Sequence, residues 1–106
     1  MCKFRNIEEA REFFRAERFA IENGCMIEEL ESGRSVCSIS LSDKHKNSSG
    51  LIMGGVVFTI ANFAYSVAAY NDYGSEEPTT VGINYLSTPK GDRLVAYADC
   101  ADIMSK

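Results

Sequence analysis

The first hydrophobic positions of the chain recur at nearly helical spacing. Residues 6–23 carry apolar side chains on one side and paired glutamate and arginine side chains on the other, which predicts an amphipathic surface helix whose charges face solvent. Asn6 can cap its start, and Glu9 stands where a capping box has an acidic residue. Gly24 supplies a stop signal. We therefore predict one helix that ends at Asn23.

A different spacing follows directly after this helix. The segments Cys25–Glu31 and 34–42 are separated by Ser32 and Gly33, and in the second segment cysteine, isoleucine and leucine alternate with serine. A period of two is typical of a half-buried strand, and a short polar turn joins the strands of a hairpin. These residues predict a β-hairpin. Residues 43–50 are polar and rich in turn formers, which predicts a loop.

Residues 51–70 form a stretch of twenty residues without a charged side chain. That is about the length of a helix that crosses a bilayer. The stretch contains Thr59 and Asn62, has Gly54 and Gly55 near its start, and lacks both tryptophan and a basic cluster near its far end. These features disfavour a membrane span. A helix that is apolar on all sides can instead be the buried centre of a domain, and we predict that role, with a membrane span as the alternative.

The C-terminal part of the chain returns to strand patterns. Two segments alternate apolar and polar side chains, and each follows a turn-rich segment. The predicted order is a loop over 71–78, a strand over 79–86, a turn over 87–93 and a strand over 94–101. The complete order of helix, two strands, long helix and two strands predicts an α+β fold, with an antiparallel sheet around or against the long central helix.

Composition and charge limit the class of protein. The chain has 106 residues, of which 45% are hydrophobic, 10% aromatic and 25% charged. This size fits a single domain over residues 1–106 and excludes a two-domain enzyme. The composition excludes a disordered chain. The net charge of -4 provides no basic surface for a phosphate backbone, so we expect no nucleic-acid partner.

The cysteines point to no metal site. The four cysteines are Cys2, Cys25, Cys37 and Cys100. They include no CxxC pair and no spacing with histidine that suits zinc. The first residues lead into a charged segment in place of an apolar signal core. We therefore expect a cytoplasmic protein with reduced thiols, each of which acts as a small buried or half-buried hydrophobic side chain.

The junction between the polar loop and the long helix is the candidate site for chemistry. Gly54 and Gly55 stand at the start of that helix, where the first N–H groups have no partner within the helix and carry the positive end of its dipole. Without a Cβ atom, glycine lets a ligand approach the backbone closely. Such N–H groups could polarise a carbonyl and stabilise an oxyanion in acyl transfer. The alternative is that the two glycines solve a packing or turn problem.

A longer motif surrounds these glycines. Asn47 is followed by Gly50, by Met53-Gly54-Gly55 and by the run FTIAN, which ends at Asn62. These residues match the pattern N..G...HGG..F.LAD of the hotdog-fold thioesterases of the phenylacetate-degradation type. The chain resembles that family over nearly its whole length.

The resemblance implies a fold and an activity. The fold is a five- or six-stranded antiparallel sheet wrapped around the long helix, with sheets paired edge to edge in a homodimer or homotetramer. The family hydrolyses acyl-CoA thioesters at sites between two subunits and uses no metal or redox cofactor. It implies that the backbone N–H of Gly55, with Gly54, holds the thioester carbonyl, that Asn47 lies beside it, and that Gly50 and Met53 contact the substrate.

Two residues depart from the family pattern. Met53 replaces the histidine before the glycine pair, and Asn62 replaces a carboxylate that would act from the partner subunit as base or nucleophile. An amide is not a base near neutral pH, so Asn62 either hydrogen-bonds a water or ligand, or is a buried amide satisfied by nearby backbone or a dimer partner. His45 lies in the polar loop, and we expect it at the surface.

These features lead to two functional hypotheses. The first is an acyl-CoA thioester hydrolase acting on a small or aromatic acyl-CoA, with Asn62, Gly55 and Asn47 as its catalytic residues. The second is a non-catalytic protein that binds acyl-CoA or CoA. Phe63, Tyr65 and Tyr70 could line an acyl pocket or belong to the core. Lys90 and Arg93 could meet CoA phosphates or be merely exposed.

The length of the chain differs from that of the family. Family members continue for two strands beyond the one predicted over 94–101, whereas this sequence stops at Lys106. A turn ending in Gly91-Asp92 is a weaker match to a family turn that contains proline. Either the strands over 79–86 and 94–101 pair as a hairpin, or a partner covers the open edge. An apolar strand edge favours a homo-oligomer.

Overall fold

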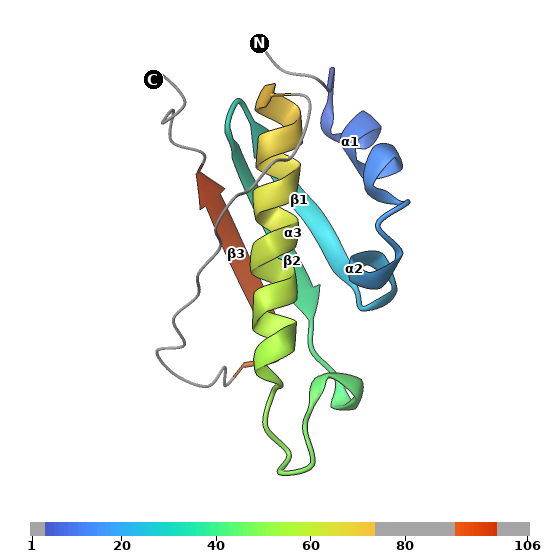
Figure 1. Ribbon diagram of the computed structural model, residues 1–106, viewed down its shortest axis with the longest axis vertical. Coiled ribbons are helices and arrows are strands. Elements are labelled where there is room, and N and C mark those ends of the chain that lie inside the picture. Colours follow the sequence, from blue (N-terminus) through green and yellow to red (C-terminus); the bar gives the residue numbers. More distant parts are fainter. Residues whose placement is uncertain (1–3, 74–90, 100–106) are drawn as a thin grey trace.

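The computed structural model describes residues 4–73 and 91–99 (Figure 1). Its elements in chain order are helices α1 (Ile7–Phe14) and α2 (Arg18–Glu22), strands β1 (Cys25–Glu31) and β2 (Arg34–Ser40), the 3-10 helix η1 (Asp43–His45), helix α3 (Gly54–Tyr73) and strand β3 (Arg93–Asp99). These three strands form an antiparallel sheet in the order β1-β2-β3. Helix α3 lies along one face of the sheet, and α1 and α2 lie beside β1. The predicted α+β fold class is confirmed.

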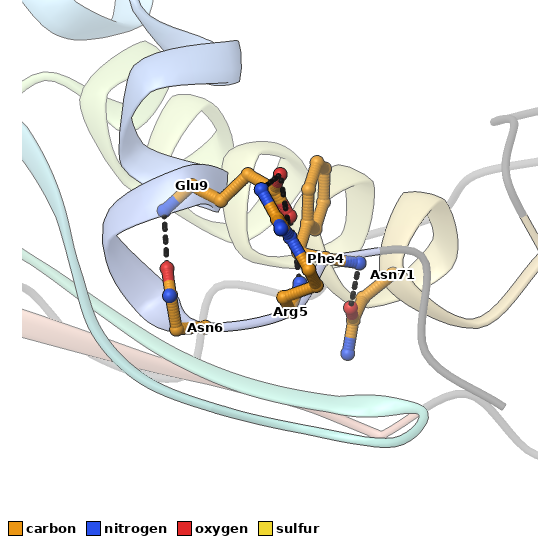
Figure 2. Close-up of polar contacts among 5 residues, drawn as sticks. All are labelled: Phe4, Arg5, Asn6, Glu9 and Asn71. Atoms are coloured by element: carbon orange, nitrogen blue, oxygen red, sulfur yellow. Dashed lines mark hydrogen bonds and ion pairs between the residues drawn. The ribbon is translucent and has the colours of Figure 1, made fainter.

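The single helix predicted over residues 6–23 is wrong, because the chain breaks between α1 and α2 at residues 15–17. Phe14 and Ala20 are both buried, yet six residues of continuous helix would turn their side chains to different sides. The break lets both face the core. The predicted cap is confirmed, since the Asn6 side chain accepts a hydrogen bond from the Glu9 N–H at 2.8 Å (Figure 2). Gly24 ends the segment with φ +98°.

The predicted hairpin is confirmed, although β2 ends two residues earlier than expected. Its strands pair from Cys25↔Ile39 to Glu31↔Arg34. Beyond Ile27 the register shifts, and the Arg11 guanidinium of α1 donates to the Ile27 carbonyl at 2.6 and 3.0 Å. Helix α1 therefore covers the β1 edge with a charged donor as well as with apolar side chains.

Strand β3 agrees with the last predicted strand, starting one residue earlier and followed to Asp99. It pairs with β2 along its whole length. The side chains of Leu94, Ala96 and Ala98 are half-buried towards the helix side, while Tyr97 is exposed on the other face. Helix α3 starts at residue 54 and continues three residues past its predicted end. The strand predicted over 79–86 lies outside the described residues, as do most of its flanking turns.

The core lies between α3 and the sheet. Helix residues Ile60, Phe63, Ala64 and Val67 meet sheet residues Cys25, Ile27, Cys37 and Ile39. The two cysteines are free and buried as predicted, and burial raises the pKa of the Cys25 thiol to about 11 and that of Cys37 to about 12. Cys2 and Cys100 lie outside the described residues. None of the described helices combines the length and the hydropathy that crossing a membrane requires.

The C-terminal part of α3 is tied to two other parts of the chain. Asn71 is 1% exposed, and its Oδ1 accepts a hydrogen bond from the Phe4 N–H at 3.2 Å (Figure 2). Its Nδ2 donates to the Glu31 carbonyl at 3.0 Å. Aromatic rings pack next to it, with centroids 5.1 to 6.0 Å apart: Phe4, Phe13, Phe14, Phe63 and Tyr70. Phe63 and Tyr70 therefore belong to the core, as one of the two alternatives predicted.

Candidate functional site

The loop that leads into α3 is a small closed hairpin. The Met53 N–H donates to the His45 carbonyl at 2.9 Å, and the Asn47 N–H donates to the Leu51 carbonyl at 2.7 Å. Between these bonds Lys46 pairs with Ile52. We call residues 45–53 the entry hairpin. Because Met53 is at its base, the entry hairpin delivers the chain directly to Gly54, the first residue of the helix.

Asn47 and Gly50 shape the tip of the entry hairpin. The Asn47 Oδ1 accepts hydrogen bonds from the Ser49 N–H at 2.9 Å and the Leu51 N–H at 3.1 Å. Gly50 has φ +82°, a conformation that a side chain disfavours. The carbonyl oxygen of the Asn47 amide therefore holds the loop, and its exposed amide nitrogen is the part that a ligand could meet. Gly50 serves the turn.

Gly55 is different from the turn glycines. Its φ is not positive, and a Cβ atom built there meets nothing within 4 Å. Neither backbone conformation nor packing against the described residues therefore requires glycine at this position. The residue is exposed in the first turn of α3, where backbone N–H groups point away from the helix. The side of the helix at Gly55 therefore borders open space.

Asn62 lies on the same side of α3 as Gly55. The two positions are seven residues apart, which makes nearly two whole turns and about 10 Å along the helix axis. Asn62 is half-buried, and its side chain makes no hydrogen bond with any other described residue. Within the described part of the chain, the neighbouring backbone does not satisfy this amide. A water, a ligand or a second copy of the chain is left to do so.

Large apolar side chains surround the helix start. Leu51 is 51% exposed, Met53 46% and Phe58 36%. A group of exposed apolar side chains around polar backbone groups is typical of a binding surface. The motif identified Met53 only as a departure from histidine. Leu51 was missed, and its place in a charge-free stretch gave no signal that it would be exposed.

A cleft of about 360 Å³ adjoins the entry hairpin. It brings the weaker Gly91-Asp92 match next to the main motif, because Gly50, Leu51, Gly91 and Asp92 all line it. The Leu41 N–H holds this turn by donating to the Asp92 carbonyl at 2.9 Å. Two segments that are about 40 residues apart in the sequence thus line the same cleft. The other lining residues are Leu41, Ser42, Asp43, Lys46 and Ile52.

The expected surface position of His45 is wrong. His45 is 1% exposed; its Nδ1 accepts from the Ser42 N–H at 3.0 Å, and its Nε2 lies 2.9 Å from the Asn23 carbonyl. Ser42 and His45 form a reciprocal capping box around η1. A serine three residues before a polar side chain is the signal that could have found this box. The contact with Asn23, 22 residues away, had no local signal.

The fold is similar to that of solved thioesterase structures. A thioesterase family protein from Silicibacter pomeroyi matches with 22% identity and a TM-score of 0.76, covering 85% of this chain and 68% of that protein. The Escherichia coli PaaI protein from the phenylacetic acid degradation operon matches with 21% identity and a TM-score of 0.74, covering 88% and 71%. Thioesterase superfamily member 2 from Mus musculus matches with 19% identity and a TM-score of 0.71, covering 88% and 71%.

These similarities concern the fold. No family sequence model matches the chain, and no curated protein matches its sequence. The neighbours nevertheless confirm, at the level of the fold, the resemblance to hotdog-fold thioesterases that the motif predicted. The chain has the hotdog fold, with a long helix against an antiparallel sheet.

Proposed function

We propose that the chain is an acyl-CoA thioester hydrolase that binds the thioester carbonyl at the start of α3. The observation that carries this proposal is Gly55, which is exposed in the first helical turn although neither its φ nor packing against described residues requires glycine. Its N–H, with that of Gly54, would donate to the oxyanion of the tetrahedral intermediate. A small or aromatic acyl group fits the likeness to the PaaI protein of the phenylacetic acid degradation operon.

The rest of the reaction follows from the chemistry of an amide. Asn62 can hydrogen-bond the attacking water but cannot take its proton near neutral pH. The proton would pass to solvent, the water oxygen would bond to the carbonyl carbon, and the C–S bond would break to release CoA and the free acid. Hydrolysis by this mechanism would be slow, because the site lacks a positioned general base, which contributes about 100-fold or more to the rate.

The site requires two copies of the chain. Gly55 and Asn62 are about 10 Å apart along one helix, which is too far for both to contact one carbonyl group. Asn62 of a second copy, facing the start of the first α3, would complete the site in a homodimer or homotetramer. Free Cys25 and Cys37 are compatible with a cytoplasmic protein, where thiols stay reduced.

Thiol release from a panel of short-chain and aromatic acyl-CoA esters tests the proposal. The wild type should turn over slowly, with a rate that changes little between pH 6 and 8, because water attacks and no group of the site takes its proton. Asn62→Asp should be about 100-fold faster at pH 7 and level off above the carboxylate pKa. Asn62→Ala is the control that removes the amide without adding a base. Absence of thiol release from both the wild type and Asn62→Asp would overturn a hydrolase.

A second function is favoured by the same departures. Met53 and Asn62 stand where the family pattern has a histidine and a carboxylate, so neither position supplies a base. The chain would then bind acyl-CoA without hydrolysing it. Titration calorimetry with an acyl-CoA ester distinguishes the two functions: affinity without turnover supports the binding protein, and turnover by the wild type excludes it.

A further inference from the structure

The buried imidazole of His45 connects two parts of the chain by opposite kinds of hydrogen bond. Its Nδ1 faces the Ser42 N–H, which can only donate, and its Nε2 faces the Asn23 carbonyl, which can only accept. Only a neutral ring with its proton on Nε2 satisfies both groups. His45 is the only histidine of the chain, and it is almost fully buried.

The backbone of His45 extends this connection to the helix start. Its carbonyl accepts a hydrogen bond from the Met53 N–H at 2.9 Å, and the Met53 carbonyl accepts one from the Val56 N–H at 3.0 Å. Met53 directly precedes Gly54. His45 is therefore connected to the first turn of α3 through a single hydrogen bond, from the Met53 N–H to the His45 carbonyl, and through the single residue Met53.

The other end of the connection is fixed. Asn23 caps α2, and its own N–H donates to the Phe19 and Ala20 carbonyls at 3.3 and 3.2 Å. Two residues later the chain enters β1 at Cys25, which is buried in the core. The imidazole therefore links the helix start to a part of the molecule that is held by the sheet.

We propose that His45 is a positioning residue, whose bond to the Asn23 carbonyl fixes the base of the entry hairpin and so aligns the N–H groups of Gly54 and Gly55 with the thioester carbonyl. This inference rests on the proposed function. A displacement of about 1 Å at donors of this kind can lower a rate by up to about 100-fold. The ring itself does not touch the substrate.

Two substitutions separate the contacts of the ring. His45→Asn keeps an acceptor near the Ser42 N–H and loses the link to Asn23, whereas His45→Gln keeps a donor for the Asn23 carbonyl and loses the acceptor. Lys44→Ala is the matched control, because it removes the exposed bond from the Lys44 Nζ to the Glu22 carbonyl at 3.1 Å, which joins the same two segments.

The first readout needs no substrate. In a ¹H–¹⁵N spectrum, the amide signals of Gly54 and Gly55 should move in His45→Asn and stay in place in His45→Gln and Lys44→Ala. The second readout is kinetic: kcat of His45→Asn should fall about tenfold with little change in KM, while His45→Gln keeps most of the wild-type kcat.

Unmoved glycine signals and an unchanged kcat in folded His45→Asn would overturn the proposal, as would equal kcat losses in the asparagine and glutamine variants. If the variants do not fold, the ring ¹⁵N signals of the wild type decide, since a neutral ring with its proton on Nδ1 contradicts the connection. Absence of turnover in both the wild type and Asn62→Asp overturns the hydrolase instead, and the glycine signals still test the placement.

Discussion

The two ends of α3 belong to one helix and have opposite environments. At its C-terminal end, Asn71 is buried and bonded to Phe4 and Glu31, next to a cluster of aromatic rings. At its N-terminal end, Gly55 faces open space and Phe58 is partly exposed. The first end holds three parts of the chain together. The second end keeps accessible positions at Gly55 and Phe58.

This difference separates stability from chemistry. Residues at the C-terminal end contribute buried area and satisfied hydrogen bonds, so substitutions there act on folding. Residues at the N-terminal end can be changed with little effect on folding, which frees them to bind a ligand or a second copy. Substitutions of the same residue type at the two ends test this division.

The largest difference is expected between two phenylalanines. Phe14 of α1 is fully buried; its ring contacts Tyr70 in the C-terminal part of α3, as well as Phe4, Phe13 and Phe63. Phe14→Ala should lower the free energy of unfolding by about 4 kcal/mol through lost burial and a cavity. Phe58→Ala is the control and should lower it by less than about 1 kcal/mol. Urea unfolding followed by circular dichroism measures both, and similar losses would contradict the division.

Two asparagines of the helix give the next largest difference. Asn71→Ala leaves the Phe4 N–H and the Glu31 carbonyl without their buried partner, which should cost about 2 kcal/mol. Asn62→Ala breaks no hydrogen bond among the described residues and should change the free energy of unfolding by less than about 0.5 kcal/mol. A loss in Asn62→Ala as large as that in Asn71→Ala would show that both ends are structural.

Gly55→Ala should act on stability and activity in opposite directions. Alanine is the better helix former, so the free energy of unfolding should rise by about 0.5 kcal/mol. The added Cβ would stand where the thioester approaches, and thiol release should fall at least about tenfold. Gly50→Ala is the contrasting variant, because its φ of +82° should make it less stable by about 1 kcal/mol. A destabilised Gly55→Ala would mean that packing selects the glycine.

The smallest effect on folding is expected when a cysteine is introduced next to the N-terminal end of α3. Met53→Cys replaces an exposed side chain and should leave the free energy of unfolding within about 0.5 kcal/mol of the wild type. Iodoacetamide at pH 8 should modify this cysteine readily. It should leave Cys25 and Cys37 unmodified, because burial raises their pKa values to about 11 and 12 and the thiolate is the reactive form. Mass spectrometry of peptides reports each position, and equal labelling would contradict the difference.

Local patterns were sufficient for the elements and insufficient for the contacts that hold them. The period of two predicted the β1–β2 hairpin to within two residues, because strand alternation depends on close sequence neighbours. The break after Phe14 was missed, since it depends on the burial of Ala20 against the rest of the fold. The sequence predicts Asn71 in a loop, whereas the structure places it in α3, bonded to partners that are 67 and 40 residues away.

The candidate site shows the same limit. The motif from Asn47 to Asn62 predicted the place where loop and helix meet, because its spacing is local. His45 was misplaced because its burial depends on Asn23, 22 residues earlier. The open space at Gly55 was not visible in the sequence either. The sequence does not distinguish a glycine that a turn requires, such as Gly50, from one that neither its φ nor packing requires, such as Gly55.

The Arg11 guanidinium on the Ile27 carbonyl also bears on the proposed pairing of two copies, because it takes up an acceptor at the β1 side of the sheet. A sheet with two open edges can add copies without end and grow into a ribbon. Here α1 and its arginine occupy the β1 side, which leaves the opposite side of the sheet as the direction in which pairing can continue. In the homodimer that we propose, edge pairing would then close at two copies and would not extend into a fibre.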